Sequence, residues 1–321
     1  MNLIEEILEA EKRIRKYITE TPLQYSQFLS KVGDCEVYLK LENMQTTGSF
    51  KIRGAMNKVL SILGEKKGVE FVTSSSGNHA LAFAYSTDSL GLKGTIYLPA
   101  YTSKAKIEAL QHYNLEINFY GDDCVKTETY ARKVAEENNS VFISPYNDSE
   151  IIAGQATVAV ELERQLKKID SILVPIGGGG LISGIGGYLK ETKSDVKIIG
   201  CQPENSAVMY ESIKAGKILD ISSKPTISDG TAGGIEENSI TFDLCTKYVD
   251  DYILVSEKAI KDAIRLVIDK QQMLVEGAGA LSVASFLKHK EKFKKQNIVL
   301  IISGSKISLD VLKEILCQSS T

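Results

Sequence analysis

A lysine, a serine-rich turn and a run of glycines are the residues of this chain whose types and spacing could do chemistry. Lys51 follows the turn 48–50 and is predicted to lie just inside a helix, which Ser49 could cap. Such an ammonium meets an unfavourable helix dipole, and any burial disfavours its charge, so we expect its pKa to fall. A less protonated lysine can form a Schiff base with an aldehyde. A surface lysine on an amphipathic helix is the alternative.

The segment 73–80, Thr-Ser-Ser-Ser-Gly-Asn-His-Ala, lies between an apolar strand and a helical stretch. Its small hydroxyl residues and its glycine would expose several backbone N–H groups at the helix start, which suits a bound carboxylate. A helix cap made of serines is the alternative, and His79 could be a satisfied polar residue in the first turn of the helix.

Four consecutive glycines, 177–180, separate another strand from another helix. Without a Cβ, this backbone can approach an anion closely and donate N–H groups to it, which predicts a phosphate-binding turn rather than a purely conformational one. The residues fit neither the G-x-G-x-x-G dinucleotide pattern nor the G-x-x-x-x-G-K-[ST] pattern of nucleotide hydrolases.

Ser303 ends a further apolar run and could make a hydrogen bond at a strand tip, and glycine-rich turns occur at 229–234 and 276–279. An activated lysine, a carboxylate-binding loop, a phosphate-binding turn and a hydroxyl are together the groups needed to hold a phosphorylated aldehyde and an amino acid. This combination predicts pyridoxal phosphate as the cofactor.

The elements that must position these residues alternate between short β-branched runs and longer amphipathic ones, which is typical of parallel sheets with crossover helices. Helices are expected at 104–113, 125–137, 150–167, 256–270 and 277–288. Strands are expected at 36–41, 69–73, 95–98, 116–120, 141–143, 172–174, 197–201, 252–255 and 298–302. Nine strands are many for one sheet, so we expect an α/β fold with two open, twisted, mostly parallel sheets flanked by helices.

The run 69–147 could form a small domain inserted in a large one made of 1–68 and 148–321. Ligand sites in such folds lie at the carboxyl ends of strands and between domains, where the turns described above are found.

The composition of the 321 residues is that of a globular protein, with 43% hydrophobic and 25% charged residues. A net charge of −3 with mixed signs argues against nucleic acid or an anionic membrane as a partner. The five scattered cysteines are expected to be free thiols, and the N-terminal segment is unlike a signal peptide. We therefore expect a cytoplasmic protein without a membrane span.

The order of these motifs resembles that of the fold-type II pyridoxal-phosphate enzymes, in particular the threonine/serine dehydratase and serine racemase group. The resemblance begins at 21–23, includes 39–43 and 49–55, and continues through 76–79, 177–181 and 303–304. It implies the tryptophan synthase β-like fold, a cofactor between two domains, an amino-acid substrate, and assembly as a homodimer or homotetramer.

The resemblance also implies a role for each matching residue. Lys51 would bind the cofactor aldehyde and act as a base, with Phe50 against the ring, Asn78 on the ring hydroxyl and Ser303 on the ring nitrogen. The phosphate would be held by backbone N–H groups of Gly177, Gly178, Gly179, Gly180 and Leu181. The substrate carboxylate would be surrounded by Ser75, Ser76, Gly77 and His79. The implied activity is conversion of L-threonine, L-serine or a related β-hydroxy amino acid to a 2-oxo acid and ammonia.

Several positions depart from the pattern of the group. Ser76 replaces the alanine of many dehydratases and is the residue type with which serine racemases deliver a proton from the face opposite the lysine. Gln202 and Val208 stand where metal-dependent racemases carry acidic ligands, so no metal site is expected, and Glu204 alone makes a poor one. Lys306 lies in an unusual Ser-Gly-Ser-Lys ending, and because the sequence stops soon after it we expect no regulatory domain of the kind found in biosynthetic threonine dehydratases.

Three alternatives to a dehydratase stay open. A serine racemase with side elimination activity is the nearest, because of Ser76. A β-replacement synthase would need a second nucleophile or a phosphorylated substrate. A noncatalytic amino-acid or cofactor-binding module would not require Lys51, because binding alone needs no Schiff base.

Overall fold

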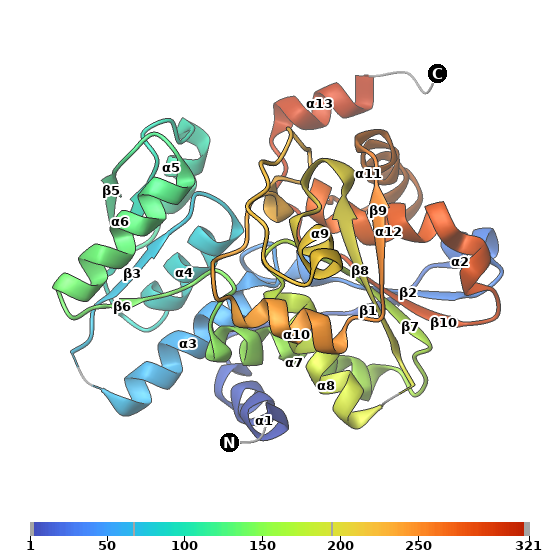
Figure 1. Cartoon of the computed structure of the whole chain (residues 1–321), viewed down its shortest axis with the longest axis horizontal. Coiled ribbons are helices and arrows are strands. Elements are labelled where there is room, and N and C mark those ends of the chain that lie inside the picture. The colour runs from blue at the N-terminus through green and yellow to red at the C-terminus, as the bar shows by residue number, and fades with distance from the viewer. Residues whose placement is uncertain (1–2, 67, 194, 318–321) are drawn as a thin grey trace.

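The computed structural model describes residues 3–66, 68–193 and 195–317, and two sheets organise this part of the chain (Figure 1). The strands of the larger sheet are β1 (Leu23–Tyr25), β2 (Glu36–Lys40), β7 (Ser171–Pro175), β8 (Lys197–Pro203), β9 (Asp251–Val255) and β10 (Asn297–Ile301). Those of the smaller sheet are β3 (Phe71–Ser74), β4 (Gly94–Leu98), β5 (Leu115–Phe119) and β6 (Val141–Phe142).

The larger sheet has the order β1-β2-β10-β7-β8-β9, and the smaller has the order β5-β4-β3-β6. Strand β1 is antiparallel to β2, whereas the other neighbours in both sheets are parallel. Because β7 and β10 are adjacent and parallel, the glycine turn that follows β7 and the Ser303 segment that follows β10 lie at the same edge of the sheet.

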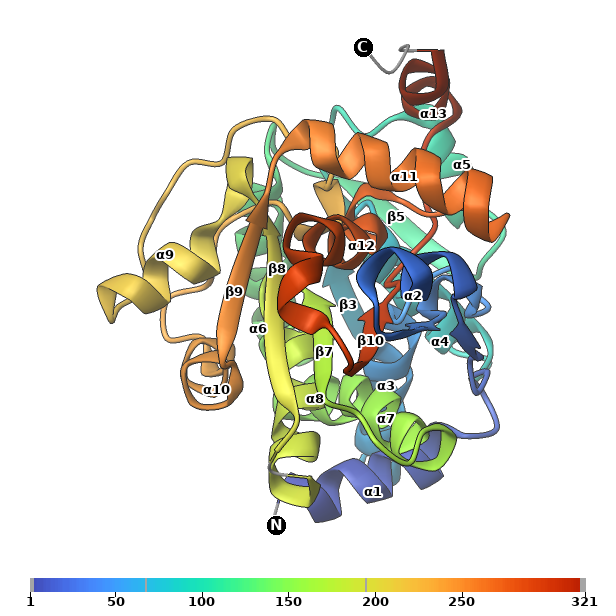
Figure 2. The same ribbon diagram turned by 90° about the vertical axis from the view of Figure 1, so that its right-hand side faces the viewer.

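Helices cover both faces of the larger sheet (Figure 2). The helices of the described part, some of which flank the smaller sheet instead, are α1 (Leu3–Ile14), α2 (Gln27–Gly33), α3 (Lys51–Glu65), α4 (Asn78–Asp88), α5 (Lys104–Leu110), α6 (Cys124–Glu137), α7 (Ser149–Gln165), α8 (Gly180–Thr192), α9 (Val208–Ala215), α10 (Ile240–Tyr248), α11 (Glu257–Gln271), α12 (Gly277–His289) and α13 (Leu309–Cys317). Short 3-10 turns occur at η1 (Glu42–Met44), η2 (Glu204–Ser206), η3 (Asp229–Thr231) and η4 (Lys290–Phe293).

Successive strand residues enter two different cores. In β7, Leu173 packs with residues of α11 and α12, whereas Ile172 and Val174 pack with α7 and α8 on the opposite face. A strand buried on both faces requires a continuous apolar run, which is why the central strands were visible in the sequence.

The predicted fold class is confirmed, since all nine predicted strands are present in two mostly parallel sheets flanked by helices. The sequence analysis missed β1, a three-residue edge strand with no buried residue and hence no apolar run. All four strands of the smaller sheet fall within 69–147. The domain boundaries at 68 and 147 stay a prediction.

The predicted cap of α3 is wrong. The helix begins at Lys51 with Phe50 as the N-cap residue, and no side chain caps it. Ser49 lies one residue too early, and its fully buried hydroxyl has no hydrogen-bond partner among the described residues. Main-chain pairing with the end of β10 holds this turn instead, through a bridge between Ser49 and Gly304.

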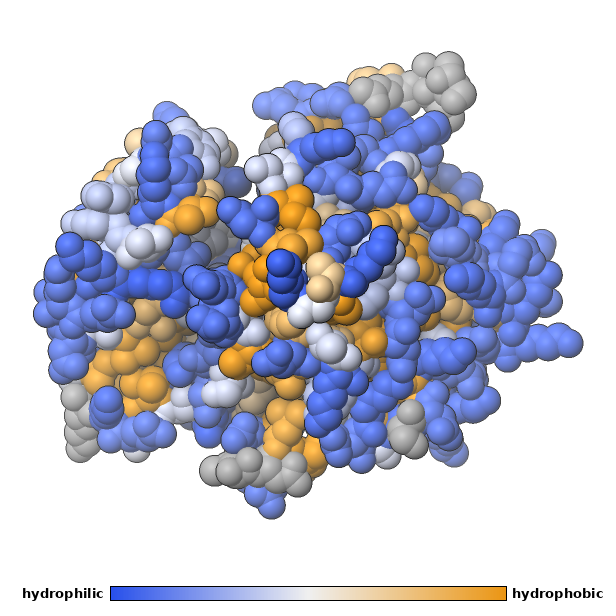
Figure 3. Space-filling model, viewed as in Figure 1, coloured by the Kyte–Doolittle hydropathy of each residue, from blue (hydrophilic) through white to orange (hydrophobic). Residues whose placement is uncertain are grey.

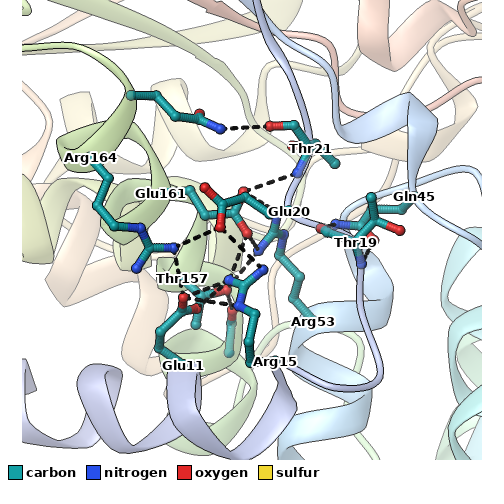
Figure 4. A network of polar contacts seen from close by, with 12 residues as sticks. Glu11, Arg15, Thr19, Glu20, Thr21, Gln45, Arg53, Thr157, Glu161 and Arg164 are labelled. Atoms are coloured by element: carbon teal, nitrogen blue, oxygen red, sulfur yellow. Dashed lines mark hydrogen bonds and ion pairs between the residues drawn. The ribbon is translucent and has the colours of Figure 1, made fainter.

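A cluster of buried charges holds α3 against α7 and against η1, which follows β2; Figure 4 labels Arg53 and Glu161 of this cluster. The Arg53 guanidinium donates to both oxygens of Glu42 at 2.7 and 2.8 Å and to both oxygens of Glu161 at 2.8 and 2.9 Å. Lys40 also pairs with Glu161, and all four side chains are fully buried. Bidentate pairs of this kind fix both distance and orientation, so they position the first turn of α3.

The surface view shows a notch between the lobe of the smaller sheet and the rest of the molecule, at the top of Figure 3. No helix in the described part has the length and apolar character to cross a membrane. Cys35, Cys124, Cys201, Cys245 and Cys317 are free thiols, as predicted.

Candidate functional site

Lys51 occupies the first position of α3 and is partly buried. Its Nζ donates a hydrogen bond to the carbonyl oxygen of Pro145 at 2.7 Å and lies 5.3 Å from the centre of the Phe50 ring. Burial lowers the pKa of Lys51 to about 8, and the Glu276 carboxylate opposes this shift. The amine therefore loses its proton close to neutral pH, as a nucleophilic or basic lysine must.

The end of β10 lies directly beside this lysine. The backbone N–H of Phe50 donates to the carbonyl oxygen of Ser303 at 3.2 Å, and Ser303 itself is buried. The hydroxyl predicted to meet a ring nitrogen is thus on a segment bonded to the residue that precedes Lys51.

The glycine turn is shaped by close contacts and by one left-handed residue. Gly179 has φ +88°, a conformation that favours glycine, and it precedes the first residue of α8. A Cβ on Gly178 would lie 2.5 Å from the Tyr146 ring, so a side chain there would collide with it. Because Tyr146 follows Pro145, the carbonyl partner of Lys51, the turn and the lysine share one neighbourhood. The unpaired N–H groups that start α8 make this turn suitable for an anion.

The serine-rich turn connects β3 to α4, whose N-cap residue Gly77 receives no side-chain cap. The Ser75 hydroxyl accepts from the backbone N–H of Gly77 at 3.2 Å, before the helix begins. The alternative of a serine-capped helix is therefore not what the structure shows. A Cβ on Gly77 would meet nothing within 4 Å, and Ser76 beside it is partly exposed, so this turn has room for a ligand.

His79 turns its imidazole away from the start of α4 and toward the smaller sheet. Its Nε2 lies 3.0 Å from the carbonyl oxygen of Ile143 and 3.1 Å from the hydroxyl of Thr73. Burial, and secondarily the charge of Lys51, lowers the pKa of His79 to about 3, so the ring is neutral. Its main-chain N–H, in the first turn of α4, is the group left to face an anion.

Asn78 is joined to a residue that the sequence analysis did not assign to the site. Its Nδ2 donates to Oε1 of Glu276 at 2.8 Å, while its Oδ1 is buried without a partner in the described part. Glu276 is only 3% exposed, and its other oxygen accepts from the backbone N–H of Lys306 at 2.8 Å. A carboxylate just before an apolar glycine-rich helix was the available signal, but its link to Asn78 spans 198 residues of sequence.

The segment 229–236 lies against the glycine turn. A Cβ on Gly177 would be 3.0 Å from the Cα of Thr231. Glu236 is held by Arg132 and by Asn147, each at 2.9 Å, and its N–H donates to the Tyr146 hydroxyl. The structure thus brings Lys51, the glycine turn, the serine-rich turn and the end of β10 together through direct contacts or one intervening residue.

Gln202 and Glu204, in the segment where the resemblance places the metal ligands of racemases, make other contacts. The Gln202 side-chain oxygen accepts from the backbone N–H of Tyr210 at 2.9 Å, and Glu204 pairs with Lys288 at 3.2 Å. Within residues 3–66, 68–193 and 195–317, no three His, Cys, Asp or Glu side chains gather as metal ligands would.

A family model described as "Pyridoxal-phosphate dependent enzyme" matches residues 14–304. The chain belongs to this family. Two curated relatives are each 36% identical to it. "L-threonine ammonia-lyase" of Thermotoga maritima aligns over 98% of the chain and 78% of the relative, and "L-threonine dehydratase catabolic TdcB" of Escherichia coli K12 over 97% and 95%.

Solved structures give the same picture. The threonine deaminase isoform 2 of Solanum lycopersicum matches with a TM-score of 0.92 at 30% identity, over 99% of this chain and 94% of that one. Maize serine racemase matches with a TM-score of 0.90 at 33% identity, over 98% and 96%.

The residues present fit the cofactor that this family uses. The glycine turn offers N–H groups without side chains, and Lys51 offers an amine whose pKa is lowered by burial. The buried oxygen of Asn78 has no partner among the described residues, which is costly unless a ligand or water meets it. These groups would hold the phosphate, the aldehyde and the ring hydroxyl of pyridoxal phosphate.

Proposed function

We propose that this protein is a pyridoxal-phosphate-dependent ammonia-lyase that converts L-threonine, L-serine or a related β-hydroxy amino acid to a 2-oxo acid and ammonia. The observation that carries the proposal is the partly buried Lys51 amine. It is hydrogen-bonded to Pro145, and the next residue, Tyr146, packs against the glycine turn. The relatives named as threonine ammonia-lyase and dehydratase, which align over nearly the whole chain, support the reaction class.

Lys51 is the central residue of the proposed mechanism. The bound cofactor supplies an aldehyde and a conjugated ring that takes up the electron pair left on the α-carbon. We assign removal of the α-proton to the Lys51 Nζ, because its lowered pKa leaves a useful fraction of free amine at neutral pH.

The remaining roles position the two ligands. We assign the phosphate to the backbone N–H groups of Gly177, Gly178, Gly179, Gly180 and Leu181, and the ring to Phe50, Asn78 and Ser303. We assign the substrate carboxylate to Ser75, Ser76, Gly77 and His79. Ser303 would present a neutral hydroxyl rather than a carboxylate to the ring nitrogen, which would stabilise negative charge on the ring only moderately. This favours prompt loss of the β-hydroxyl after the proton is removed.

The second candidate is a serine racemase with side elimination activity. Ser76 favours it, since this hydroxyl lies on the open serine-rich turn and could deliver a proton to the face opposite Lys51. Two serine racemase structures, from maize and Dictyostelium discoideum, are also similar to the chain.

Incubation of the purified holoprotein with L-serine separates the two. We expect pyruvate and ammonia to exceed D-serine, and a screen of β-hydroxy amino acids for ammonia release would then identify the preferred substrate. D-serine as the main product would establish the racemase instead. Release of oxo acid without an added nucleophile would argue against a β-replacement synthase, and a protein that binds cofactor but releases no product would be a binding module.

We also propose that the chain acts in the cytoplasm as a homodimer or homotetramer, with a larger cofactor-binding domain of 1–68 and 148–321 and a smaller one of 69–147. Light scattering of the holoprotein tests the assembly. The mixed-sign net charge of −3 supports the absence of a nucleic-acid partner.

A further inference from the structure

Glu276 is a buried carboxylate in the site to which no role has yet been given. It precedes α12 and is 3% exposed. Both of its oxygens are used, because Oε1 accepts from Asn78 Nδ2 and Oε2 accepts from the backbone N–H of Lys306, each at 2.8 Å. A Cβ on Gly304 would lie 2.4 Å from Oε1, so the carboxylate fills a space that only glycine leaves open.

The surroundings of Glu276 do not neutralise its charge. Among the residues that the structure describes, no salt bridge reaches it. Burial raises the pKa of Glu276 to about 7, Asp229 on η3 adds to this, and the hydrogen bonds from Asn78 and Lys306 oppose it. The charges of Lys306, beyond β10, and of Lys51, on α3, also face it. A buried carboxylate kept without an ionic partner is expensive for stability, which suggests a role in the site.

The hydrogen bond to Glu276 decides how the Asn78 amide is oriented. An amide has two N–H groups on one side and an oxygen on the other, and a carboxylate can only accept from it. Glu276 therefore directs Nδ2 toward itself and turns the Asn78 Oδ1, which has no partner among the described residues, toward the ligand.

We propose that Glu276 is the positioning residue that holds Asn78 with its Oδ1 directed at the ring hydroxyl of the cofactor. The inference rests on the cofactor assigned under the proposed function, but not on which substrate is used. It predicts that a carboxylate is required at 276 rather than any polar side chain of similar size. In a glutamine one of the two terminal atoms is an N–H2 donor, so either the Asn78 Nδ2 or the Lys306 N–H would face a donor instead of an acceptor.

Three variants test the proposal: Glu276→Gln removes the charge, Glu276→Asp keeps a carboxylate, and Glu257→Gln is the matched control. Glu257 is a glutamate that is partly buried rather than fully buried, and it accepts from the backbone N–H of Ile227 but makes no bond with Asn78. Three quantities are measured for each protein. They are the equilibrium dissociation constant of pyridoxal phosphate, the pH midpoint of the visible band of bound cofactor, and the thermal unfolding of the cofactor-free protein.

We expect Glu276→Gln to weaken cofactor binding by about tenfold or more, as loss of a charged hydrogen-bond partner should, and to move the pH midpoint of the band. Glu276→Asp should recover part of both. Glu257→Gln should change only the unfolding temperature. If Glu276→Gln binds cofactor within about twofold of the wild type with an unchanged pH midpoint, the proposal is wrong.

Failure of the proposed function gives a different result. A wild-type protein that binds the cofactor but releases no oxo acid would overturn the ammonia-lyase assignment, while the shifts at Glu276 would still support the positioning role. A wild-type protein that binds no cofactor would overturn both.

Discussion

Lys51 and Arg53 lie two residues apart on α3, and each belongs to a different group of buried charges. The two groups differ in whether their charges form ion pairs. Arg53 enters a cluster in which each charge has an oppositely charged partner, whereas Lys51 and Glu276 make hydrogen bonds but no ion pair in the described part. The first group consists of Lys40, Glu42, Arg53 and Glu161, and is called the paired cluster below. The second consists of Lys51 and Glu276, which are called the isolated charges below.

The pKa values of Arg53 and Lys51 move in opposite directions, as do those of Glu161 and Glu276, although burial lowers the pKa of Lys40 despite its pairing. In the paired cluster, burial opposes the charges, but Glu42 and Glu161 outweigh it and raise the pKa of Arg53 further. Arg53 and Lys40 likewise hold the pKa of Glu161 at about 2 despite its burial. For the isolated charges, burial dominates and brings the pKa of Lys51 to about 8 and that of Glu276 to about 7. Arg53 and Glu161 are thus fixed in their charge states and position α3, while Lys51 and Glu276 can exchange protons near neutral pH.

The largest effect is expected on the rate of the reaction when Lys51 is replaced, compared with replacement of another lysine on the same helix. Lys51→Ala should lower the rate of oxo-acid formation by about a thousandfold or more, because it removes both the cofactor bond and the base. The control is Lys58→Ala, two turns further along α3, whose side chain pairs with Asp148. Steady-state assays measure both rates. A comparable loss of rate in the two variants would show that Lys51 has no catalytic role.

The paired cluster should matter for stability rather than for chemistry alone. Arg53→Met leaves Glu42 and Glu161 buried without their main partner, so the free energy of unfolding should fall by about 3–5 kcal/mol. Urea unfolding of the cofactor-free protein measures this. The exposed pair of Lys12 and Glu9 is the control, and Lys12→Ala should change stability by less than about 1 kcal/mol. Equal effects of the two variants would show that burial of the cluster is unimportant.

The glycine turn should tolerate no side chain at Gly178. Gly178→Ala would push against the Tyr146 ring, so we expect cofactor affinity to fall by about tenfold. Gly64→Ala in α3 is the control, since a Cβ there meets nothing within 4 Å. Fluorescence titration with pyridoxal phosphate compares them. Unchanged affinity in Gly178→Ala would mean that the turn can rearrange freely or does not hold the phosphate.

The smallest effect is the pH dependence of stability that comes from Lys51. Its pKa in the folded cofactor-free protein is about 8, below the ordinary 10.5, so the unfolded chain binds more protons between these values. Stability contributed by this residue therefore rises with pH from about 8 to 10.5. Lys51→Met should be more stable than the wild type at pH 7, and the difference should shrink toward pH 10. A difference that stayed constant over this range would contradict the lowered pKa.

The sequence predicted the site residues that belong to local motifs and missed those whose role depends on contacts between segments distant in sequence. The glycine turn and Ser303 each stand at the end of an apolar run, and the topology brings such ends together, while Lys51 follows a turn that opens a helix. The cap at Ser49 was wrong because pairing with Gly304, which is distant in sequence, decides the geometry of that turn. Glu276 was not assigned to the site for the same reason, since its bond to Asn78 is invisible to any local pattern.

The central claim is that the Lys51 amine holds the cofactor aldehyde, and peptide mapping of the borohydride-reduced holoprotein tests it most directly. We predict that reduction leaves the cofactor attached covalently to the peptide that contains Lys51, and to no peptide in Lys51→Ala. Attachment to a different lysine, or a Lys51 peptide of unchanged mass with excess cofactor present, would contradict the account.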